Sequence, residues 1–412
     1  MASTERVEMR GHILNSGALS RVLDEILASE GDYVLEHLDV GRAMPDFSSA
    51  RIAVTHDDDD KLESIISRIQ TYGANAVEDT DVLTEPAPAD GVLPEGFYSS
   101  TNLETKVRLN GKWLRVPNPE MDCGLVVDAD GVHIRPMSDV KQGEEVIVTS
   151  AGVKVEIAPR PVVDKDETVF EFMNSVVSSE KPQALLVRKI ADGMRETKEA
   201  GKKILWVGGP AIVHTGAAPA MCALIRAGWC DVLFAGNALA THDIESAMFG
   251  TSLGVDLSRG SGVDHGHEHH IRSINRIRAA GSIKQAVEQG VLPSGIMHTL
   301  VESGSEFVLV GSVRDDGPLP DVITDVLEGQ RAMRAAIPGV GYAVMVATML
   351  HAIATGNLMP ASIPLVCVDI NPATVTKLAD RGSAQATGVV TDIGLFLEQL
   401  AIELVPGYST AR

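Results

Sequence analysis

The feature that most constrains the fold is the alternation of short apolar runs with helical patterns in the C-terminal part of the chain. Four apolar runs of strand length follow one another from about residue 167 onward, at residues 203–207, 231–234, 306–310 and 364–368. Longer helical patterns separate them, as at residues 271–280 and 321–336, and the apolar run 342–354 has the length of a strand followed by a helix. Strands that alternate with helices form a mostly parallel sheet covered on both faces, so we expect a doubly wound α/β domain.

The first 84 residues show a different order of elements. Strand-like runs occur at residues 7–14, 33–40, 51–55 and between 76 and 83. Apolar residues at helical spacing predict helices at 19–27 and 62–69. The acidic run 57–60 precedes the second helix, where the positive end of the helix dipole favours it. The order β-α-β-β-α-β is that of a ferredoxin-like layer.

The middle of the chain predicts a small β-rich module. The segment 84–91 contains two prolines and a glycine without periodicity, which indicates a linker. Runs with period two then extend from about residue 97 to 161, and Asn110-Gly111 between two of them signals a type I′ hairpin. We therefore predict three domains: a ferredoxin-like α/β domain at 1–84, a β-rich module at 95–165 and a large α/β domain at 166–412.

Composition and charge exclude several classes of protein. The chain of 412 residues carries 35 basic and 56 acidic residues, a net charge of −21, and a surface this acidic repels nucleic acid. No stretch approaches the ~18 uninterrupted apolar residues of a membrane helix, and the N-terminus lacks the apolar core of a secretory signal. The four cysteines are scattered without Cys-x-x-Cys spacing, which is typical of free buried thiols in a reducing compartment. We expect a cytoplasmic protein.

The predicted C-terminal strands end in loops rich in glycine and small polar residues. These loops lie at residues 207–211, 234–238, 310–317 and 368–372. Glycine lets a ligand approach the backbone, and a helix N-terminus after such a loop can hold a phosphate. Ligands of such sheets bind beyond the carboxyl ends of the strands. No Gly-x-Gly-x-x-Gly sequence follows any of these strands, so a standard Rossmann fingerprint is not indicated.

Acidic residues at two strand ends are candidates for binding a ribose. Asp369 ends an apolar run, where a carboxylate can chelate a diol or, equally, cap the helix that begins near Pro372. Asp392 ends a second run in the same manner. Residues 355–359 close a helical run and are candidates for presenting backbone amides to a cofactor.

The densest polar cluster is DHGHEHH at residues 264–270. It contains His265-x-x-Glu268-His269, formally the inverted zinc-peptidase pattern, in which two histidines share a metal. Gly266 lies inside the cluster and argues against a stable helix there. We therefore favour a polar loop that contributes a catalytic histidine over a metal site.

The run Arg314-Asp315-Asp316 is a second polar cluster with two interpretations. Adjacent acids after a buried strand can bind a ribose or an amine. Ordinary turn chemistry would also produce the Asp-Gly-Pro sequence found here.

Four longer motifs carry a family resemblance. They are residues 311–325 (GSVRDDGPLPDVITD), 347–357 (ATMLHAIATGN), 366–372 (VCVDINP) and 376–383 (TKLADRGS). They resemble the archaeal-type ornithine cyclodeaminase family, also labelled lysine-ketoglutarate reductase/saccharopine dehydrogenase bifunctional enzyme conserved region. The same family forms the C-terminal part of cyanobacterial arginine dihydrolase/ornithine cyclodeaminase fusions. Residues 11–17 and 20–24 resemble its N-terminal region, so the resemblance covers nearly the whole chain.

The resemblance implies an NAD-binding domain similar to that of deoxyhypusine synthase, which agrees with the missing fingerprint. Carried over by motif, the NAD contacts would be Asn237, Ala238, Asp315 or its neighbour Asp316, Thr355, Gly356, Asn357, Leu358, Met359, Asp369, Asp392 and Ile393. It also implies conversion of ornithine to proline and ammonia, with NAD recycled within each turnover. A homo-oligomer is the default assembly for such enzymes.

That reaction needs groups that move protons and anchor the substrate. We expect Asp316 or His265 to transfer the proton, Arg314 to bind the carboxylate and Glu268 to anchor an amine. Two other functions are kept as alternatives. One is an NAD-linked dehydrogenase of another diamino acid or a saccharopine-like substrate, and the other is a non-catalytic amino-acid or nucleotide sensor.

Overall fold

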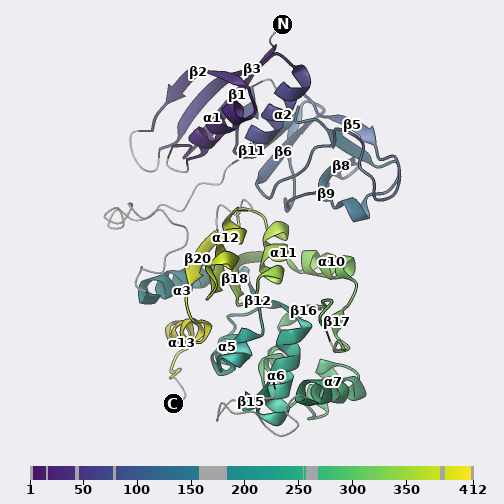
Figure 1. The fold of residues 1–412 in the computed structure, drawn as a ribbon, viewed down its shortest axis with the longest axis vertical. Coiled ribbons are helices and arrows are strands. Elements are labelled where there is room, and N and C mark those ends of the chain that lie inside the picture. Colours follow the sequence, from purple (N-terminus) through teal and green to yellow (C-terminus); the bar gives the residue numbers. More distant parts are fainter. Residues whose placement is uncertain are drawn as a thin grey trace. The chain divides into compact units, whose positions relative to one another are not determined.

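The computed structural model describes residues 3–14, 17–41, 46–77, 80–156, 183–253, 255–256, 268–315, 317–380 and 386–409. The chain forms two compact units (Figure 1). The first comprises Met1–Asn174 and Asn357–Ser362, and the second comprises Ser175–Gly356 and Ile363–Arg412. No helix in these described ranges is long and apolar enough to span a membrane.

The first unit begins with a four-stranded antiparallel sheet and two helices. The elements are β1 (Ser3–Gly11), α1 (Ala18–Ala28), β2 (Asp32–Asp39), β3 (Ser48–His56), α2 (Asp59–Gln70) and β4 (Asn75–Ala76). The strand order β2-β3-β1-β4 confirms the predicted ferredoxin-like layer, although its last strand has only two residues. Asp58 caps α2 by accepting hydrogen bonds from the N–H groups of Asp60 and Lys61, which explains the acidic run before that helix.

A β-rich part follows, built from two small antiparallel sheets. One contains β5 (Leu83–Pro86), β10 (Glu145–Val148), β8 (Gly124–Asp128) and β9 (Gly131–Arg135), and the other β11 (Val153–Glu156), β6 (Glu104–Leu109) and β7 (Lys112–Arg115). β6 and β7 form the predicted hairpin, and the φ angles of Asn110 and Gly111, 51° and 74°, match a type I′ turn.

The linker predicted at residues 84–91 is wrong at its start, because residues 83–86 form strand β5. This strand lies at the edge of its sheet, where Pro86 can end a strand without removing a ladder hydrogen bond. The ferredoxin-like layer and the β-rich part have separate apolar cores. The division of the chain into three domains stays a prediction.

The first unit is completed by a segment that lies far along the chain. Ala361 N donates to the carbonyl of Asn102 at 2.6 Å, and Asn102 Nδ2 donates to Met359 O at 3.3 Å. Met121 N donates to Asn357 O at 3.0 Å. Asn102 is only 2% exposed, so its polar groups need these partners. Residues 357–362 are therefore an integral part of this unit.

The second unit contains a seven-stranded parallel sheet. In spatial order the strands are β17 (Val322–Ile323), β16 (Glu306–Val310), β13 (Val232–Gly236), β12 (Lys203–Gly208), β18 (Val340–Val346), β19 (Leu365–Asp369) and β20 (Ala386–Val390). Without the short edge strand β17, this is the order 3-2-1-4-5-6 of the dinucleotide-binding fold. The predicted doubly wound parallel sheet is confirmed, and its topological switch point lies between β12 and β18.

Helices pack around this sheet, as Figure 1 shows. They are α3 (Gln183–Glu199), α4 (Ala211–His214), α5 (Ala218–Arg226), α6 (Asn237–Phe249), α7 (His269–Ala280), α8 (Ile283–Glu288), α9 (Ile296–Ser303), α10 (Val326–Ala336), α11 (Leu350–Leu358), α12 (Pro372–Asp380) and α13 (Ile393–Leu404). A short ribbon of β14 (Thr251–Ser252) and β15 (Val255–Asp256) follows α6.

The central strands are buried on both faces. Trp206, Phe234 and Val344 are 0% exposed, which explains why these strands are continuous apolar runs rather than alternating ones.

All four cysteines are free and buried, as predicted. The helix predicted over 321–336 is wrong in its first turn, because residues 322–323 form β17 and Asp325 caps α10.

Candidate functional site

The carboxyl edge of the parallel sheet is the edge that doubly wound folds use for binding. At the switch point, the residues after β12 and β18 are packed tightly together. Gly209 N donates to Val346 O at 2.9 Å, and a Cβ on Gly209 would lie 1.8 Å from Ala347 O. Ala347 itself has a φ of 57°, a left-handed conformation that is uncommon for a residue with a Cβ. Only glycine at position 209 allows this close approach.

His351, on α11 shortly after β18, lies over the ends of β13 and β16. A Cβ on Gly236 would lie 3.1 Å from His351 Cε1, and the ring is hydrogen-bonded to the backbone of Val310. Burial lowers the pKa of His351, and the Val310 backbone and the charge of Asp315 oppose that shift in part. A neutral histidine near pH 7 can accept or donate a hydrogen bond at this edge. Sequence analysis did not propose it, although a histidine inside the apolar run 342–354 was a signal.

The loop after β16 folds back on the end of its own strand. Asp315 Oδ2 accepts a hydrogen bond from Ser312 N at 2.8 Å, and its charge acts on His351. Arg314 is exposed. Asp316, a predicted proton-transfer group, lies outside the described residues. The structure thus brings Asp315 together with His351.

Helix α6 presents its N-terminus at the same edge. Gly236 precedes the helix in an extended conformation, and no side chain caps the first turn. Ala238 in that turn is exposed. Asn237 is 4% exposed and its Oδ1 accepts from Leu319 N at 3.0 Å, which ties the loop after β16 to α6. An uncapped first turn offers N–H groups to an anion.

Asp369 and Asp392 lie beyond the switch point, at the ends of β19 and β20. Asp369 Oδ1 accepts a hydrogen bond from Asn371 N at 2.8 Å. The side chain of Asn371 accepts one in turn from Ala373 N, in the first turn of α12, at 3.0 Å. The capping interpretation of Asp369 is therefore wrong, because Asn371 takes that place. Asp392 caps α13, whose first residue is Ile393. The ends of β16 and β19 are four strand spacings apart, about 19 Å, so Asp315 and Asp369 cannot contact the same chemical group.

Helix α11 contains the predicted contacts Thr355 and Gly356. Thr355 is 0% exposed, and its Oγ1 has no hydrogen-bond partner in the described part of the chain. An orphaned buried hydroxyl is costly, so Thr355 remains a candidate contact for a polar group of a ligand. The remaining predicted contacts of this run, residues 357–359, belong to the first unit.

The polar cluster at residues 264–270 is described only from Glu268 onward, so His265 lies outside the described residues. Glu268 Oε2 accepts from Arg272 at 2.5 and 3.0 Å, a partner that sequence analysis did not anticipate. The role of Glu268 as an amine anchor stays a prediction. Across the described ranges, no group of three or more His, Cys, Asp or Glu side chains could hold a metal ion.

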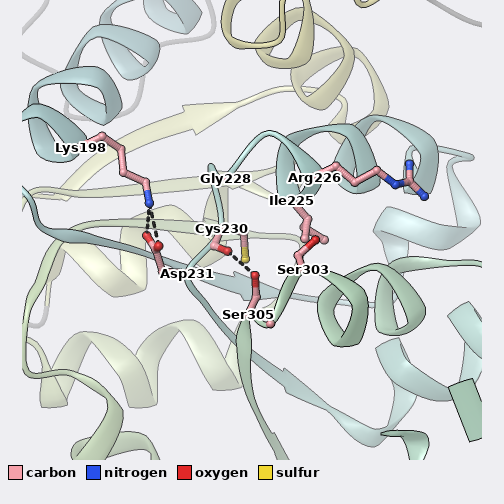
Figure 2. Close-up of a pocket in the computed structure, with 9 residues that line it drawn as sticks. Lys198, Ile225, Arg226, Gly228, Cys230, Asp231, Ser303 and Ser305 are labelled. Atoms are coloured by element: carbon pink, nitrogen blue, oxygen red, sulfur yellow. Dashed lines mark hydrogen bonds and ion pairs between the residues drawn. The ribbon is translucent and has the colours of Figure 1, made fainter. Parts of the chain in front are cut away.

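A pocket of about 310 Å³ opens at the opposite edge of the sheet, near the starts of β13 and β16 (Figure 2). Helices α3, α5 and α9 end beside it, so the negative ends of three helix dipoles disfavour a phosphate there. Lys198 Nζ bonds both carboxylate oxygens of Asp231 at 2.7 Å, and Asp231 Oδ2 also accepts from Ile204 N. These contacts tie α3 to the sheet.

The strand order, the tight switch point and the uncapped helix at the carboxyl edge define a doubly wound α/β protein of the dinucleotide-binding class. Residues 188–400 match the family model described as arginine dihydrolase ArgZ-like, C-terminal, Rossmann fold. Residues 104–187 match the first region of the same C-terminal part, and residues 4–103 match the LOR/SDH bifunctional enzyme conserved region. The chain belongs to this family, the one that includes the archaeal ornithine cyclodeaminases, and the resemblance found in the sequence is confirmed.

Known relatives match nearly the whole length of the chain. An ornithine cyclodeaminase from Methanothermobacter thermautotrophicus is 50% identical over 404 residues, 98% of each chain. The apo crystal structure of the cyanobacterial arginine dihydrolase ArgZ has a TM-score of 0.84 and 35% identity, covering 98% of this chain and 58% of that one. The ternary complex of AgrE with ornithine and NAD+ has a TM-score of 0.53 and 39% identity, with the same coverage. AgrE is a bifunctional arginine dihydrolase/ornithine cyclodeaminase from Nostoc.

Proposed function

We propose that this chain is an NAD-dependent ornithine cyclodeaminase, which converts L-ornithine to L-proline and ammonia. The observation that carries the proposal is 50% identity to an archaeal ornithine cyclodeaminase over 98% of both chains. The complex of AgrE, a relative that binds ornithine and NAD+, supports both ligands. A homo-oligomeric state and a cytoplasmic location stay predictions.

Three features of the second unit fit NAD. The uncapped first turn of α6 suits the negative charge of the phosphates. Asp369 has a carboxylate oxygen beyond the one bound to Asn371, and a ribose diol can donate to it. Thr355 Oγ1 is buried and lacks a partner in the described part of the chain. We assign NAD binding to those residues of the second unit that the resemblance implies, with these three positions as the best supported.

Bound NAD+ supplies a hydride acceptor that later returns the same hydride, so turnover consumes no cofactor. The residues of the chain must bind the substrate carboxylate, take a proton from an ammonium group and exclude water. Arg314 is our candidate for the carboxylate, and Asp316 or His265 for the proton. His351 joins these candidates as a neutral group that can orient a ligand at the strand ends.

The test is incubation of the purified chain with L-ornithine and substoichiometric NAD+. We expect proline and ammonia in equal amounts without accumulation of NADH. Asp369→Ala should raise KM for NAD+, whereas Asp192→Ala on the exposed face of α3 should leave it unchanged. Absence of both proline and ammonia refutes the proposal. In a second incubation with NAD+ in excess over ornithine, NADH formed in proportion to the substrate consumed would instead support a diamino-acid dehydrogenase, and nucleotide binding without turnover would support a sensor.

A further inference from the structure

A second cluster of titratable side chains lies in the second unit, centred on Glu245 of α6. Glu245 is 0% exposed. Gly250 ends α6 with a left-handed φ of 69° and turns the chain back along the helix. Thr251 Oγ1 therefore donates to Glu245 Oε1 at 2.9 Å, and Leu253 N donates to Oε2 at 3.3 Å. A carboxylate buried to this extent depends on such partners.

Glu245 fixes the tautomers of two histidines. His242, one helical turn earlier, donates Nδ1–H to Glu245 Oε2 at 2.9 Å, because a carboxylate can only accept. The hydroxyl of Thr251 gives its single proton to Glu245. His269 Nδ1, 2.8 Å from Thr251 Oγ1, is therefore the donor in that contact. Both imidazoles keep Nε2 as their proton acceptor.

Neighbouring elements position the rings. His269 stacks on Phe249 with the ring centroids 4.7 Å apart. Among the described residues, the titratable groups that face His242 include His214 from α4 at 4.9 Å between ring centroids, His270 from α7 at 6.5 Å, and Glu245 from its own helix. Burial lowers the pKa of His214, and His242 adds to this shift. His242 bonds Glu245 directly through Nδ1.

We propose that His242 takes the proton from a substrate ammonium group, and that Glu245 and Thr251 are positioning residues for this step. An ammonium nitrogen has no lone pair to assist loss of hydride from its carbon, so it must first be deprotonated. One N–H bond of the ammonium breaks, an Nε2–H bond forms, and the positive charge moves to an imidazolium that Glu245 stabilises through Nδ1. The proton returns to the departing amine, which leaves His242 neutral.

This inference rests on the proposed function and extends it. A buried carboxylate that holds the Nδ1–H of an imidazole, with Nε2 turned to the reacting group, is a geometry used in general acid–base catalysis. The carboxyl-edge residues described above would then bind the cofactor, and the cluster around Glu245 would handle the proton of the substrate.

The test compares His242→Ala and Glu245→Gln with His133→Ala. His133 is a matched control, because its Nε2 pairs with Asp128 at 3.1 Å on an exposed surface of the first unit. We expect His242→Ala to lower kcat for proline formation about 10²- to 10⁴-fold, with Kd for NAD+ and Tm close to those of the wild type. Added imidazole should restore part of this activity. Glu245→Gln should shift the acid limb of the kcat profile to lower pH, because the imidazolium loses its carboxylate, and a purely structural role would not produce that shift.

A folded His242→Ala variant that keeps the wild-type kcat and pH profile overturns the inference. If that variant does not fold, His242→Gln keeps the size of the side chain, and unchanged kcat in this variant has the same meaning. Bound zinc that a chelator removes together with activity also overturns it, since Nε2 would then be a metal ligand. Wild-type protein that forms no proline instead refutes the proposed function itself.

Discussion

Replacing Gly209 by alanine should force apart the two strand ends at the switch point. The new Cβ would lie 1.8 Å from Ala347 O, whereas ordinary van der Waals contact begins at 3.4 Å. The strand ends would therefore have to separate by about 1.6 Å. That movement breaks the hydrogen bond from Gly209 N to Val346 O, about 1 kcal/mol, and overpacking of a filled interior costs about 1–3 kcal/mol more. A loss of about 3 kcal/mol lowers Tm by ~6–12 °C in a domain of this size.

The fluorescence of Trp206, 0% exposed on β12, provides the assay. Of the three tryptophans only Trp113 lies in the first unit, so a Trp113→Phe background restricts the signal to the second unit. Gly216→Ala is the control, because its φ of 77° brings left-handed strain of about 1–2 kcal/mol but a Cβ there meets nothing within 4 Å. Equal Tm values for the Gly209 variant and its parent, or a greater loss in the Gly216 variant, would refute the steric argument.

Three further predictions test the contacts around the sheet. Asp231→Asn should lower the free energy of unfolding by about 1 kcal/mol in urea titrations, because Lys198 and the Ile204 N–H lose an anionic acceptor. Burial lowers the pKa of His351 in the folded state, so stability is fully present above the unfolded pKa and should fall as pH drops below about 6.5. His351→Gln should flatten this dependence of Tm on pH, and an unchanged slope would contradict it. Gly236→Ala, whose Cβ would lie 3.1 Å from His351 Cε1, should displace the ring and lower kcat with little change in Tm; unaltered kcat would argue against a role for His351.

Much of the fold could be predicted because the burial of a strand or helix determines which of its positions are apolar. The central strands are enclosed on both faces and are therefore continuous apolar runs, as around Trp206. The hairpin at Asn110-Gly111 and the acidic cap at Asp58 could be predicted because only a few residue types satisfy these local conformations. Such signals lie within a few residues of the structure that they specify.

Two of the elements that sequence analysis missed, β5 and β17, are short edge strands. β5 and β17 have four and two residues, too few to show a period, and β5 ends on a proline that also suits a linker. Their pairing is decided by partners distant in the chain, β10 for β5 and β16 for β17. Tertiary contact rather than local preference creates these strands.

The candidate site was predicted in part for a similar reason. The strand-end positions of Asp315 and Asp369 follow from the order of strands. Which polar side chain caps a helix depends on a difference of two residues, and Asn371 rather than Asp369 takes that role. Glu245 was missed because nothing in the local sequence indicates that a turn at Gly250 will bring Thr251 against it.

The late segment 357–362, which completes the first unit, also sets an order of events during synthesis. After residue 174 the ribosome must add more than 180 residues before this segment is made, about 10–40 s at 5–20 residues per second. Until then the carbonyl and amide of Asn102 lack their native partners. The N-terminal unit of this protein therefore reaches its final structure only after most of the second unit has been translated, which reverses the usual order of domain maturation.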